Sequence, residues 1–333
     1  MNSSSSESAE LRVEDAVAAL FLLGFGGLAL LRRGDMSLLL GEESFWEMSF
    51  LVAPLAILVF LVALRYAIGP DETGPIAALA ESAGVVRDFL PFLVFSVTYA
   101  SFRLNLVGSL LGADQDRELL RLDRFFFGET PSVTMEQWVT PWLTDTLAVC
   151  YFLHLILPPA LAIWLYRRER RLFRFLLLSV LLAGFIGSIG YLVVPAAGPA
   201  VAFAGLFRVD LAGSFFEPIT GLLDAARAPR DAFPSLHVGI SSVVLWVAAR
   251  KSWRLAVAVL PLVVGNWVAT LYLRYHYAVD VVAGWATAGL ALVLSDLLLA
   301  WEERIRNRRQ AAISIVQRQK GPEDRRTSEN RFG

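Results

Sequence analysis

Eight long stretches of the chain consist mostly of apolar residues, and most of the charged residues lie between them. A helix that crosses a bilayer needs about 20 largely apolar residues, so each stretch is a candidate membrane span. The stretches are residues 13–31, 45–66, 89–110, 142–165, 172–194, 235–250, 253–272 and 278–300. The sixth is short, and the seventh follows it closely. The pattern predicts an all-α fold class, a polytopic helical bundle in a membrane.

The composition supports this fold class. Hydrophobic residues make up 56% of the 333 residues and charged residues only 18%, and the mean hydropathy is +0.55. A soluble domain has about 45–50% apolar and about 25% charged residues. A net charge of −1 provides no field that would attract nucleic acid. The single cysteine, Cys150, excludes an internal disulfide and a cysteine-based zinc site.

The basic residues predict how the spans are oriented, because cytoplasmic loops carry an excess of Lys and Arg. Three basic segments fall on one side of an eight-span chain, namely residues 167–171, 250–254 and 301–333. We expect that side, and with it the C-terminus, to be cytoplasmic. Arg32 and Arg33 fall on the other side and are discordant. The long segments 112–140 and 195–234 would then lie outside.

Two of the three histidines lie in positions suited to chemistry. In the stretch Pro234-Ser235-Leu236-His237, the proline ends a loop and Ser235 is a good N-cap for the sixth span. His237 is therefore expected in the first turn of a helix, where free backbone N–H groups and the helix dipole favour an anion. His276 and Asp280 are four residues apart at the start of the eighth span, so they share one helix face.

These residues together predict phosphoryl transfer. A carboxylate bound to one ring nitrogen raises the basicity of the other, so Asp280 could make His276 a nucleophile or base. Arg274 could bind phosphate oxygens with its planar fork. Because two spans separate His237 from His276, both lie on one membrane face, which the basic residues place outside. Either histidine alone is more often a polar tip at the membrane interface. The combination indicates a phosphohistidine mechanism that needs no metal and no cofactor.

At these residues the chain resembles the type 2 phosphatidic acid phosphatase superfamily. The P-S-x-H motif matches residues 234–237, and the H-x-x-x-D motif followed by A-G matches His276, Asp280 and residues 283–284. The resemblance covers about residues 90–300 and implies a six-helix core. It implies that His276 attacks phosphorus, that Asp280 orients it and that His237 protonates the leaving alkoxide.

Departures from the usual motifs indicate one branch of the superfamily. The usual first motif, with a lysine and a later Arg-Pro, is missing, and Thr270 stands where an arginine is usual. These features resemble the inositolphosphotransferase branch, which contains inositol phosphorylceramide synthases. So do residues 122–128 with Pro131, upstream of a helix that carries Tyr151. Ala200 stands where that branch would have a basic residue.

Further residues are candidates for binding phosphate. Arg103 lies near the outer end of the third span, where an arginine is costly and is a functional candidate by default. Arg230 precedes the P-S-x-H motif. The simpler alternatives are that Arg103 snorkels to the headgroups and that Arg230 is a solvated surface residue. The predicted phosphate-binding residues are Arg274, Arg103, Ser235 and Arg230. Asp145 lies near the outer end of the fourth span and is expected at the membrane interface. His154 lies deeper in that span, and we expect it to form a hydrogen bond between helices in preference to a catalytic role.

The chain is therefore expected to have four parts. They are a disordered tail over residues 1–12, two extra transmembrane helices and a linker over 13–88, a catalytic six-helix domain over 89–300 and a basic cytoplasmic tail over 301–333. Arginines outnumber lysines 28 to two, which is typical of a GC-rich genome, and we expect an integral protein of a bacterial plasma membrane.

We predict an enzyme that acts on a lipid phosphoester at the extracytoplasmic face. If water accepts the phosphoryl group, the enzyme is a lipid phosphatase, and if an alcohol accepts it, the enzyme is a headgroup transferase, which the branch resemblance favours. A non-catalytic lipid-binding or scaffold protein is a third alternative. The expected partners are the lipid substrate, water or an alcohol acceptor and membrane lipids. The sequence identifies neither the acceptor nor the oligomeric state.

Overall fold

The computed structural model describes residues 12–33, 83–90, 93–96, 99, 113–226 and 228–319, and all of the regular elements in these ranges are helices. They are α1 (Val13–Arg33), α4 (Asp116–Phe127), α5 (Pro131–Thr134), the 3₁₀ helix η2 (Met135–Trp138), α6 (Pro141–Leu153), α7 (Leu157–Tyr166), α8 (Arg170–Val193), α9 (Pro199–Ala202), the 3₁₀ helix η3 (Ala204–Leu206), α10 (Phe216–Ala226), α11 (Leu236–Lys251), α12 (Trp253–Tyr272) and α13 (Ala278–Gln319). The predicted all-α fold class is confirmed.

Three helices of the described part, α8, α12 and α13, are long and apolar enough to cross a membrane. The pair α6 and α7, bent by 44°, adds a fourth span if the two helices count as one. The predicted span 45–66 and most of the span 89–110 lie outside the described residues, so the number of eight spans stays a prediction.

Two boundaries differ from the prediction. The expected span 142–165 is broken after Leu153, because Pro158 and Pro159 in the first turn of α7 lack the N–H groups that would bond to the carbonyls of His154 and Leu155. Helix α13 was expected to end near residue 300, but it continues to Gln319. The residues after 300 are rich in Glu, Arg, Gln and Ala, which favour helix.

Helix α8 lies at the centre of the bundle and packs against α1, α7, α11 and α13. Glycines let it approach the segment before α11 closely. A Cβ atom at Gly187 would lie 2.5 Å from the Leu236 side chain, and one at Gly190 would lie 2.2 Å from Cδ of Pro234. Larger residues at these two positions would push the P-S-x-H segment away from α8.

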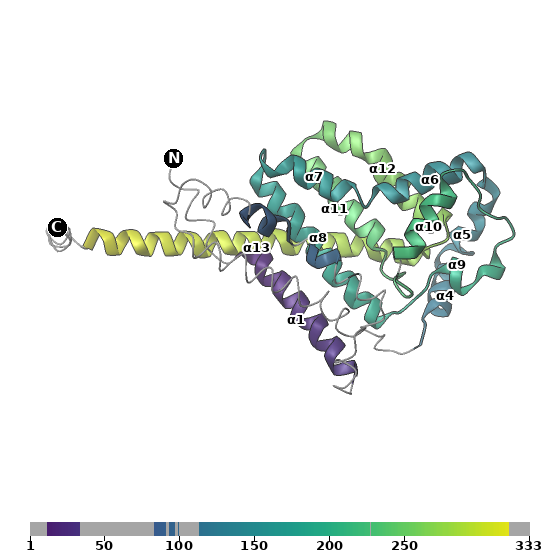
Figure 1. The fold of residues 1–333 in the computed structure, drawn as a ribbon, viewed down its shortest axis with the longest axis horizontal. Helices are drawn as coiled ribbons and strands as arrows, with labels where there is room; N and C mark the ends of the chain where they lie inside the picture. Colours follow the sequence, from purple (N-terminus) through teal and green to yellow (C-terminus); the bar gives the residue numbers. More distant parts are fainter. Residues whose placement is uncertain are drawn as a thin grey trace.

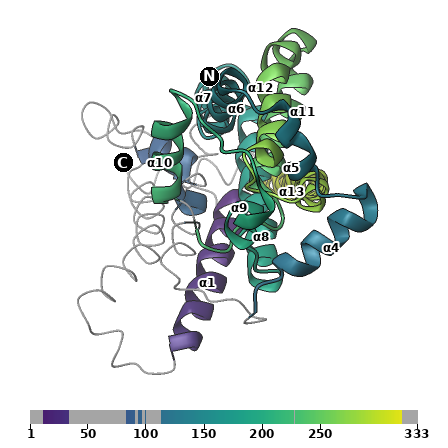
Figure 2. The same cartoon turned by 90° about the vertical axis from the view of Figure 1, so that its right-hand side faces the viewer.

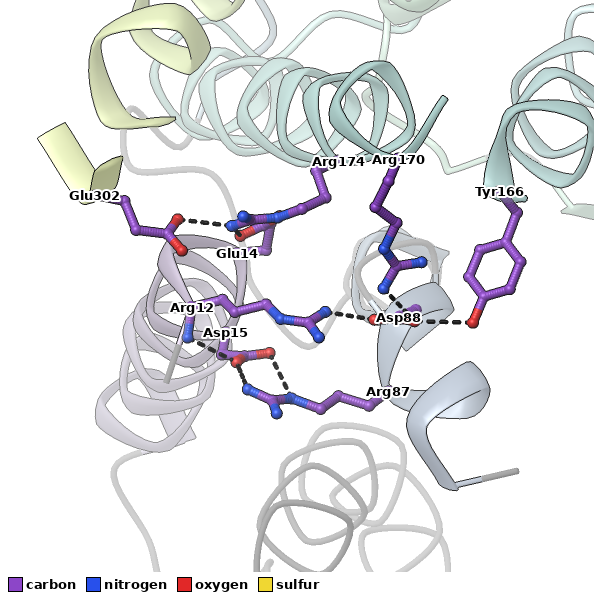
Figure 3. Close-up of polar contacts among 9 residues, drawn as sticks. All are labelled: Arg12, Glu14, Asp15, Arg87, Asp88, Tyr166, Arg170, Arg174 and Glu302. Atoms are coloured by element: carbon purple, nitrogen blue, oxygen red, sulfur yellow. Dashed lines mark hydrogen bonds and ion pairs between the residues drawn. The ribbon is translucent and has the colours of Figure 1, made fainter. Parts of the chain in front are cut away.

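A network of arginines and carboxylates ties the start of α1 to the bundle (Figure 3). Its members are Arg12, Glu14, Asp15, Arg87, Asp88, Tyr166, Arg170, Arg174 and Glu302. Asp88 accepts hydrogen bonds from Arg12, Arg170 and the Tyr166 hydroxyl. Arg174 bridges Glu14 and Glu302, with 2.6 Å to each carboxylate. The network therefore joins α1 to α7, α8 and α13 at one end of the bundle.

The segments 112–140 and 195–234, expected as outer loops, contain short helices at the opposite end. Figure 1 shows α4, α5, α9 and α10 gathered there, whereas the C-terminal part of α13 extends beyond the other end. Asp145, expected as an interfacial residue, fixes one of these short helices. Its carboxylate accepts hydrogen bonds from the amides of Ser214, Phe215 and Phe216 at the start of α10.

Candidate active site

All three histidines of the chain meet at the end of the bundle where α11 and α13 begin. The ring centroids of His237 and His276 are 5.7 Å apart, and those of His237 and His154 are 4.1 Å apart. His237 lies in the first turn of α11, His276 two residues before α13, and His154 at the break between α6 and α7. The predicted convergence of His237 and His276 is confirmed.

Main-chain groups hold His276 in place. Its Nδ1 lies 2.8 Å from the carbonyl oxygen of Ala232 and 3.5 Å from Oδ2 of Asp280. Because a carbonyl only accepts hydrogen bonds, this contact requires a proton on Nδ1 and leaves the lone pair on Nε2. The amide of His276 also donates to the carbonyl of Thr270 at 3.0 Å. The orienting carboxylate expected from Asp280 is thus farther away than a backbone oxygen.

Asp280 connects the two motifs. The side chain is fully buried, and its Oδ2 accepts a hydrogen bond from the Tyr277 amide at 2.8 Å. Its main-chain carbonyl accepts one from the Ser235 amide at 3.1 Å. Its Oδ1 has no hydrogen-bond partner in the described part of the chain. Asp280 therefore closes the first turn of α13 and joins that turn to the start of α11.

His237 is held by aromatic and amide groups. Its ring stacks on the ring of Tyr151, with centroids 4.1 Å apart and an interplanar angle of 18°. The Tyr151 hydroxyl lies 3.4 Å from Nδ1 of His237. On α12, Asn266 donates to the main-chain carbonyl of His237 at 2.9 Å. The ring is thus supported by α6 and the backbone by α12.

His154 lies beside His237, although the sequence favours hydrogen bonding between helices over a catalytic role for it. Its side chain is buried, and its Nδ1 lies 2.9 Å from the carbonyl oxygen of Tyr151. The ring reaches His237 because the helix stops at residue 153. The Pro158-Pro159 pair predicts that break. From it, His154 could have been recognised as a residue at a helix end instead of one in the middle of a continuous span.

Arg274 is engaged by protein groups. Its guanidinium lies 3.1 Å from Oε1 of Glu136, donates to the carbonyl of Val209 and stacks 4.2 Å above the ring of Phe207. Its backbone has a φ of +67°, which is uncommon for a residue other than glycine. Burial lowers the pKa of the guanidinium, although Glu136 opposes that shift. In the structure, Arg274 therefore pins the segment 207–209 to η2.

The other candidates for binding phosphate are dispersed. Ser235 is fully buried, and its hydroxyl accepts a hydrogen bond from the Val238 amide at 3.4 Å, which confirms it as the N-cap of α11. Arg230 lies at the surface, with Nε 2.7 Å from Asp114. Arg103 lies outside the described residues.

The glycine of the A-G pair has a packing role. A Cβ atom at Gly284 would lie 2.5 Å from the main-chain oxygen of Ser235 and 3.0 Å from Cβ of Val238. Helices α11 and α13 therefore touch through backbone atoms one turn away from Asp280. This contact brings the two histidine motifs together.

Two buried aspartates of α4 hold the segment that carries His276, and neither was singled out from the sequence. Asp123 accepts hydrogen bonds from the amides of Ala278 and Val279, each at 3.0 Å, and from the Thr130 hydroxyl at 2.6 Å. Asp116 accepts hydrogen bonds from the Tyr277 hydroxyl at 2.9 Å and from the amides of Ala197 and Gly198.

Burial and the Asp116 charge raise the pKa of the Tyr277 hydroxyl well above its ordinary value, so it remains a donor. Asp123 lies in the stretch 122–128, which resembles the inositolphosphotransferase branch. That resemblance alone does not indicate that Asp123 contacts the start of α13.

Comparisons with known proteins agree with the motifs. Residues 117–294 match the family model described as the PAP2 superfamily. The chain is 25% identical over 247 residues to the phosphoinositol dihydroceramide synthase of Bacteroides thetaiotaomicron, an alignment that covers 64% of this chain and 74% of that protein. No solved structure matches the chain. The family match spans more than half of the chain and includes both histidine motifs, so this protein belongs to the PAP2 superfamily, as the motifs predicted.

Proposed function

We propose that the protein is an integral membrane enzyme that transfers a phosphoryl or phosphoalcohol group from a lipid phosphoester through a covalent intermediate on His276. Membership of the PAP2 superfamily supports lipid phosphoester chemistry. The observation that carries the proposal is the 2.8 Å contact from Nδ1 of His276 to the Ala232 carbonyl, with His237 nearby. That contact leaves Nε2 of His276 as the nucleophilic nitrogen.

The reaction would proceed in two steps. In the first, Nε2 of His276 attacks phosphorus, the bond from phosphorus to the leaving oxygen breaks, and His237 gives that oxygen a proton. In the second, the oxygen of water or an alcohol attacks phosphorus, the P–N bond breaks, and His237 takes the proton. Asp280 and the Ala232 carbonyl would keep the ring of His276 oriented.

The first turn of α11 and Arg103 are the proposed ligands of the phosphate oxygens, together with Ser235, Arg230 and Arg274. The structure pairs Arg274 with Glu136, so binding phosphate would require this arginine to exchange one anion for another. Substrate binding would then loosen the segment 207–209.

We propose that an alcohol, in preference to water, is the acceptor in the second step. The chain is similar to a protein named phosphoinositol dihydroceramide synthase, and the departures from the usual motifs resemble the inositolphosphotransferase branch. We therefore propose headgroup transfer of that type ahead of hydrolysis by a lipid phosphatase.

The extracytoplasmic location of the site is also a proposal. It is supported by the distribution of charge along α11, which carries His237 in its first turn and Arg250 and Lys251 at its end. These two residues pair with Asp296 and Glu169 at the end of the bundle away from the histidines. Basic residues favour the cytoplasmic side.

The chemistry is tested with purified protein, a panel of lipid phosphates and phospholipids, and candidate acceptors that include inositol, glycerol and ceramide. Inorganic phosphate release that His276→Ala abolishes identifies a phosphatase. A new lipid that forms only with an added acceptor identifies a transferase. Ser242→Ala is the matched control, because the Ser242 hydroxyl donates to the Val238 carbonyl of its own helix. Equal product from wild type and His276→Ala contradicts the proposal.

The intermediate is tested with a labelled donor. Wild type that is quenched rapidly after mixing with the donor should carry acid-labile label on His276. Removing the proton donor by His237→Ala should slow formation of that label and lower kcat by about 10²–10⁴. His276→Ala should carry no label.

The orientation is tested by labelling single cysteines in a Cys150→Ala background. A membrane-impermeant maleimide added to intact cells should label Arg208→Cys, and it should label Arg306→Cys only after the cells are opened. The reverse pattern would place the site on the cytoplasmic side.

A further inference from the structure

Helix α4 has two faces with different surroundings. One face is buried and carries Asp116 and Asp123, the aspartates that hold the His276 segment. The other face and the last turn expose apolar side chains. The exposed apolar residues are Leu122, Phe125, Phe126 and Phe127, and the most exposed is Phe125 at 80%. Figure 2 shows α4 projecting from the side of the bundle. Such an aromatic cluster is unfavourable in water.

The contacts of Asp123 place α4 beside the start of α13. Asp123 binds the amides of Ala278 and Val279, the first two residues of α13. Helix α13 is a candidate span from its first residue, so Asp123 lies where a span begins. Phe125, Phe126 and Phe127 follow within about one helical turn. They therefore lie close to the level at which α13 begins.

The polar residues of α4 fit the same level. Arg117, Arg121 and Arg124 are exposed on the helix. Arg121 pairs with Glu118 and Arg124 with Glu129, and Arg117 can meet lipid phosphates. Trp142 is 74% exposed in the first turn of α6, which begins beside the last residue of α12. Tryptophan and tyrosine side chains concentrate at membrane interfaces because they have both an apolar body and a polar edge, and phenylalanine is common on the apolar face of interfacial helices.

We propose that α4 is an interfacial helix. Phe125, Phe126 and Phe127 insert into the bilayer at the headgroup–acyl boundary, and α4 transmits this anchoring to the His276 segment through Asp123 and Asp116. The partner is the lipid surface on the side of the site. The location stands independently of the enzymatic proposal, whereas the effect on catalysis rests on the proposed function.

The location is tested with a spin label at Phe126→Cys in the Cys150→Ala background, in bilayer nanodiscs. We expect the spin label at position 126 to be more accessible to dissolved oxygen than to a water-soluble nickel chelate. A label at Arg208→Cys, in an exposed loop, provides the aqueous reference. Access to the nickel chelate equal to that at position 208 would overturn the proposal. A label shielded from both reagents would overturn it too, because a protein partner or a second copy would then cover the phenylalanines.

The effect on catalysis is tested with two groups of variants. Phe125→Ser combined with Phe127→Ser should raise nickel access at position 126 and lower kcat several-fold with KM little changed. Asp123→Asn should lower kcat by about tenfold or more, because small misplacements of reacting groups are costly, while the depth of the label at position 126 is kept. Ser242→Ala on α11, whose hydroxyl donates to the Val238 carbonyl of its own helix, is the control and should change neither readout.

If the serine variant loses insertion and keeps the wild-type kcat, the anchoring of α4 does not position His276, and this part of the proposal is wrong. A wild-type protein without activity would overturn the proposed function and leave the depth measurement to decide the location.

Discussion

The hydrogen bond that sets the tautomer of His276 goes to the main-chain oxygen of Ala232 and not to the side chain of Asp280. The Ala232 carbonyl lies nearer to Nδ1 than the Asp280 carboxylate does. The Ala232 amide is itself bonded to the Ala196 carbonyl at 3.0 Å, so the acceptor is fixed by the loop. Asp280 is then needed most for the turn that it closes with the Tyr277 amide.

This arrangement predicts different effects for two substitutions of Asp280. An asparagine keeps an oxygen that can accept from the Tyr277 amide, so Asp280→Asn should keep the wild-type Tm and part of kcat. Asp280→Ala removes the cap and should cost about 1 kcal/mol of stability as well as activity. Thermal unfolding in detergent and kcat measure the two effects. Equal Tm and equal loss of kcat in both variants would show that the charge matters more than the hydrogen bond.

His154 provides a second prediction at this scale. Its ring supports His237 by contact, and small misplacements of an acid–base group can cost up to about 10²-fold in rate. His154→Ala should therefore lower kcat by about tenfold or more, and His154→Phe, which keeps a ring there, should recover most of it. Comparing kcat for the two variants tests this. If phenylalanine is as poor as alanine, the imidazole nitrogens themselves are required.

At the scale of elements, the site depends on how closely α11 and α13 approach. The contact is possible because Gly284 faces the backbone of Ser235. The P-S-x-H and H-x-x-x-D motifs start neighbouring helices, and the glycine sets the distance between them. Small residues allow such close packing of helices in membranes.

A pair of glycine variants tests this contact. Gly284→Ala should cost about 1–3 kcal/mol of stability through overpacking and should lower kcat by displacing His237 from His276. Gly289→Ala on the same helix is the matched control, since its Cβ would meet nothing within 4 Å. It should leave kcat unchanged and keep or slightly raise Tm. Similar losses in the two variants would contradict a specific role for Gly284.

Several elements could be predicted from the sequence, because membranes impose a simple pattern. A span needs a long apolar stretch, so α8, α11 and α12 begin and end close to the predicted residues. Ser235 was predictable as an N-cap because capping is local. Counting spans placed His237 and His276 on one face without any knowledge of their contacts.

The missed features depend on distant parts of the chain. The Ala232 carbonyl is a main-chain group with no sequence signature. Glu136, the partner of Arg274, lies 138 residues away in the chain. Asp123 reaches the start of α13 only through the tertiary fold. None of these contacts follows from spacing or periodicity.

At the scale of the whole molecule, the bundle has two polar ends with different roles. One end carries the histidines, and the other carries the arginine–carboxylate network of Figure 3. The network includes Arg12 and Glu14 at the start of α1 and Glu302 on α13. It makes α1 part of the bundle, so the first helix contributes to stability far from the site.

The network predicts a dependence of stability on pH. Burial raises the pKa of Asp88, but hydrogen bonds and charges from Arg170 and Arg12 outweigh it and hold the pKa below its ordinary value. The stabilisation is therefore complete above the unfolded pKa of about 3.9 and is lost as the pH falls through the lower folded value. Asp88→Asn should lower Tm at pH 7 and should lose less stability than wild type on acidification below about pH 4.

Thermal unfolding in detergent between neutral and acidic pH measures this difference. Asp296→Asn is the control, because its ion pair with Arg250 is partly exposed and exposed pairs contribute little. An identical acid response of wild type and Asp88→Asn would contradict the prediction.

The length of α13 has a practical consequence. Its 42 residues span about 63 Å at 1.5 Å per residue, roughly twice the hydrocarbon thickness of a bilayer of about 30 Å. One straight rod thus begins beside His276 and emerges from the far end of the bundle (Figure 1). A helical fusion that continues this rod in register after Gln319 would hold an attached protein at a fixed angle. It would give a membrane protein of 36.7 kDa the rigid fiducial mass that single-particle imaging requires.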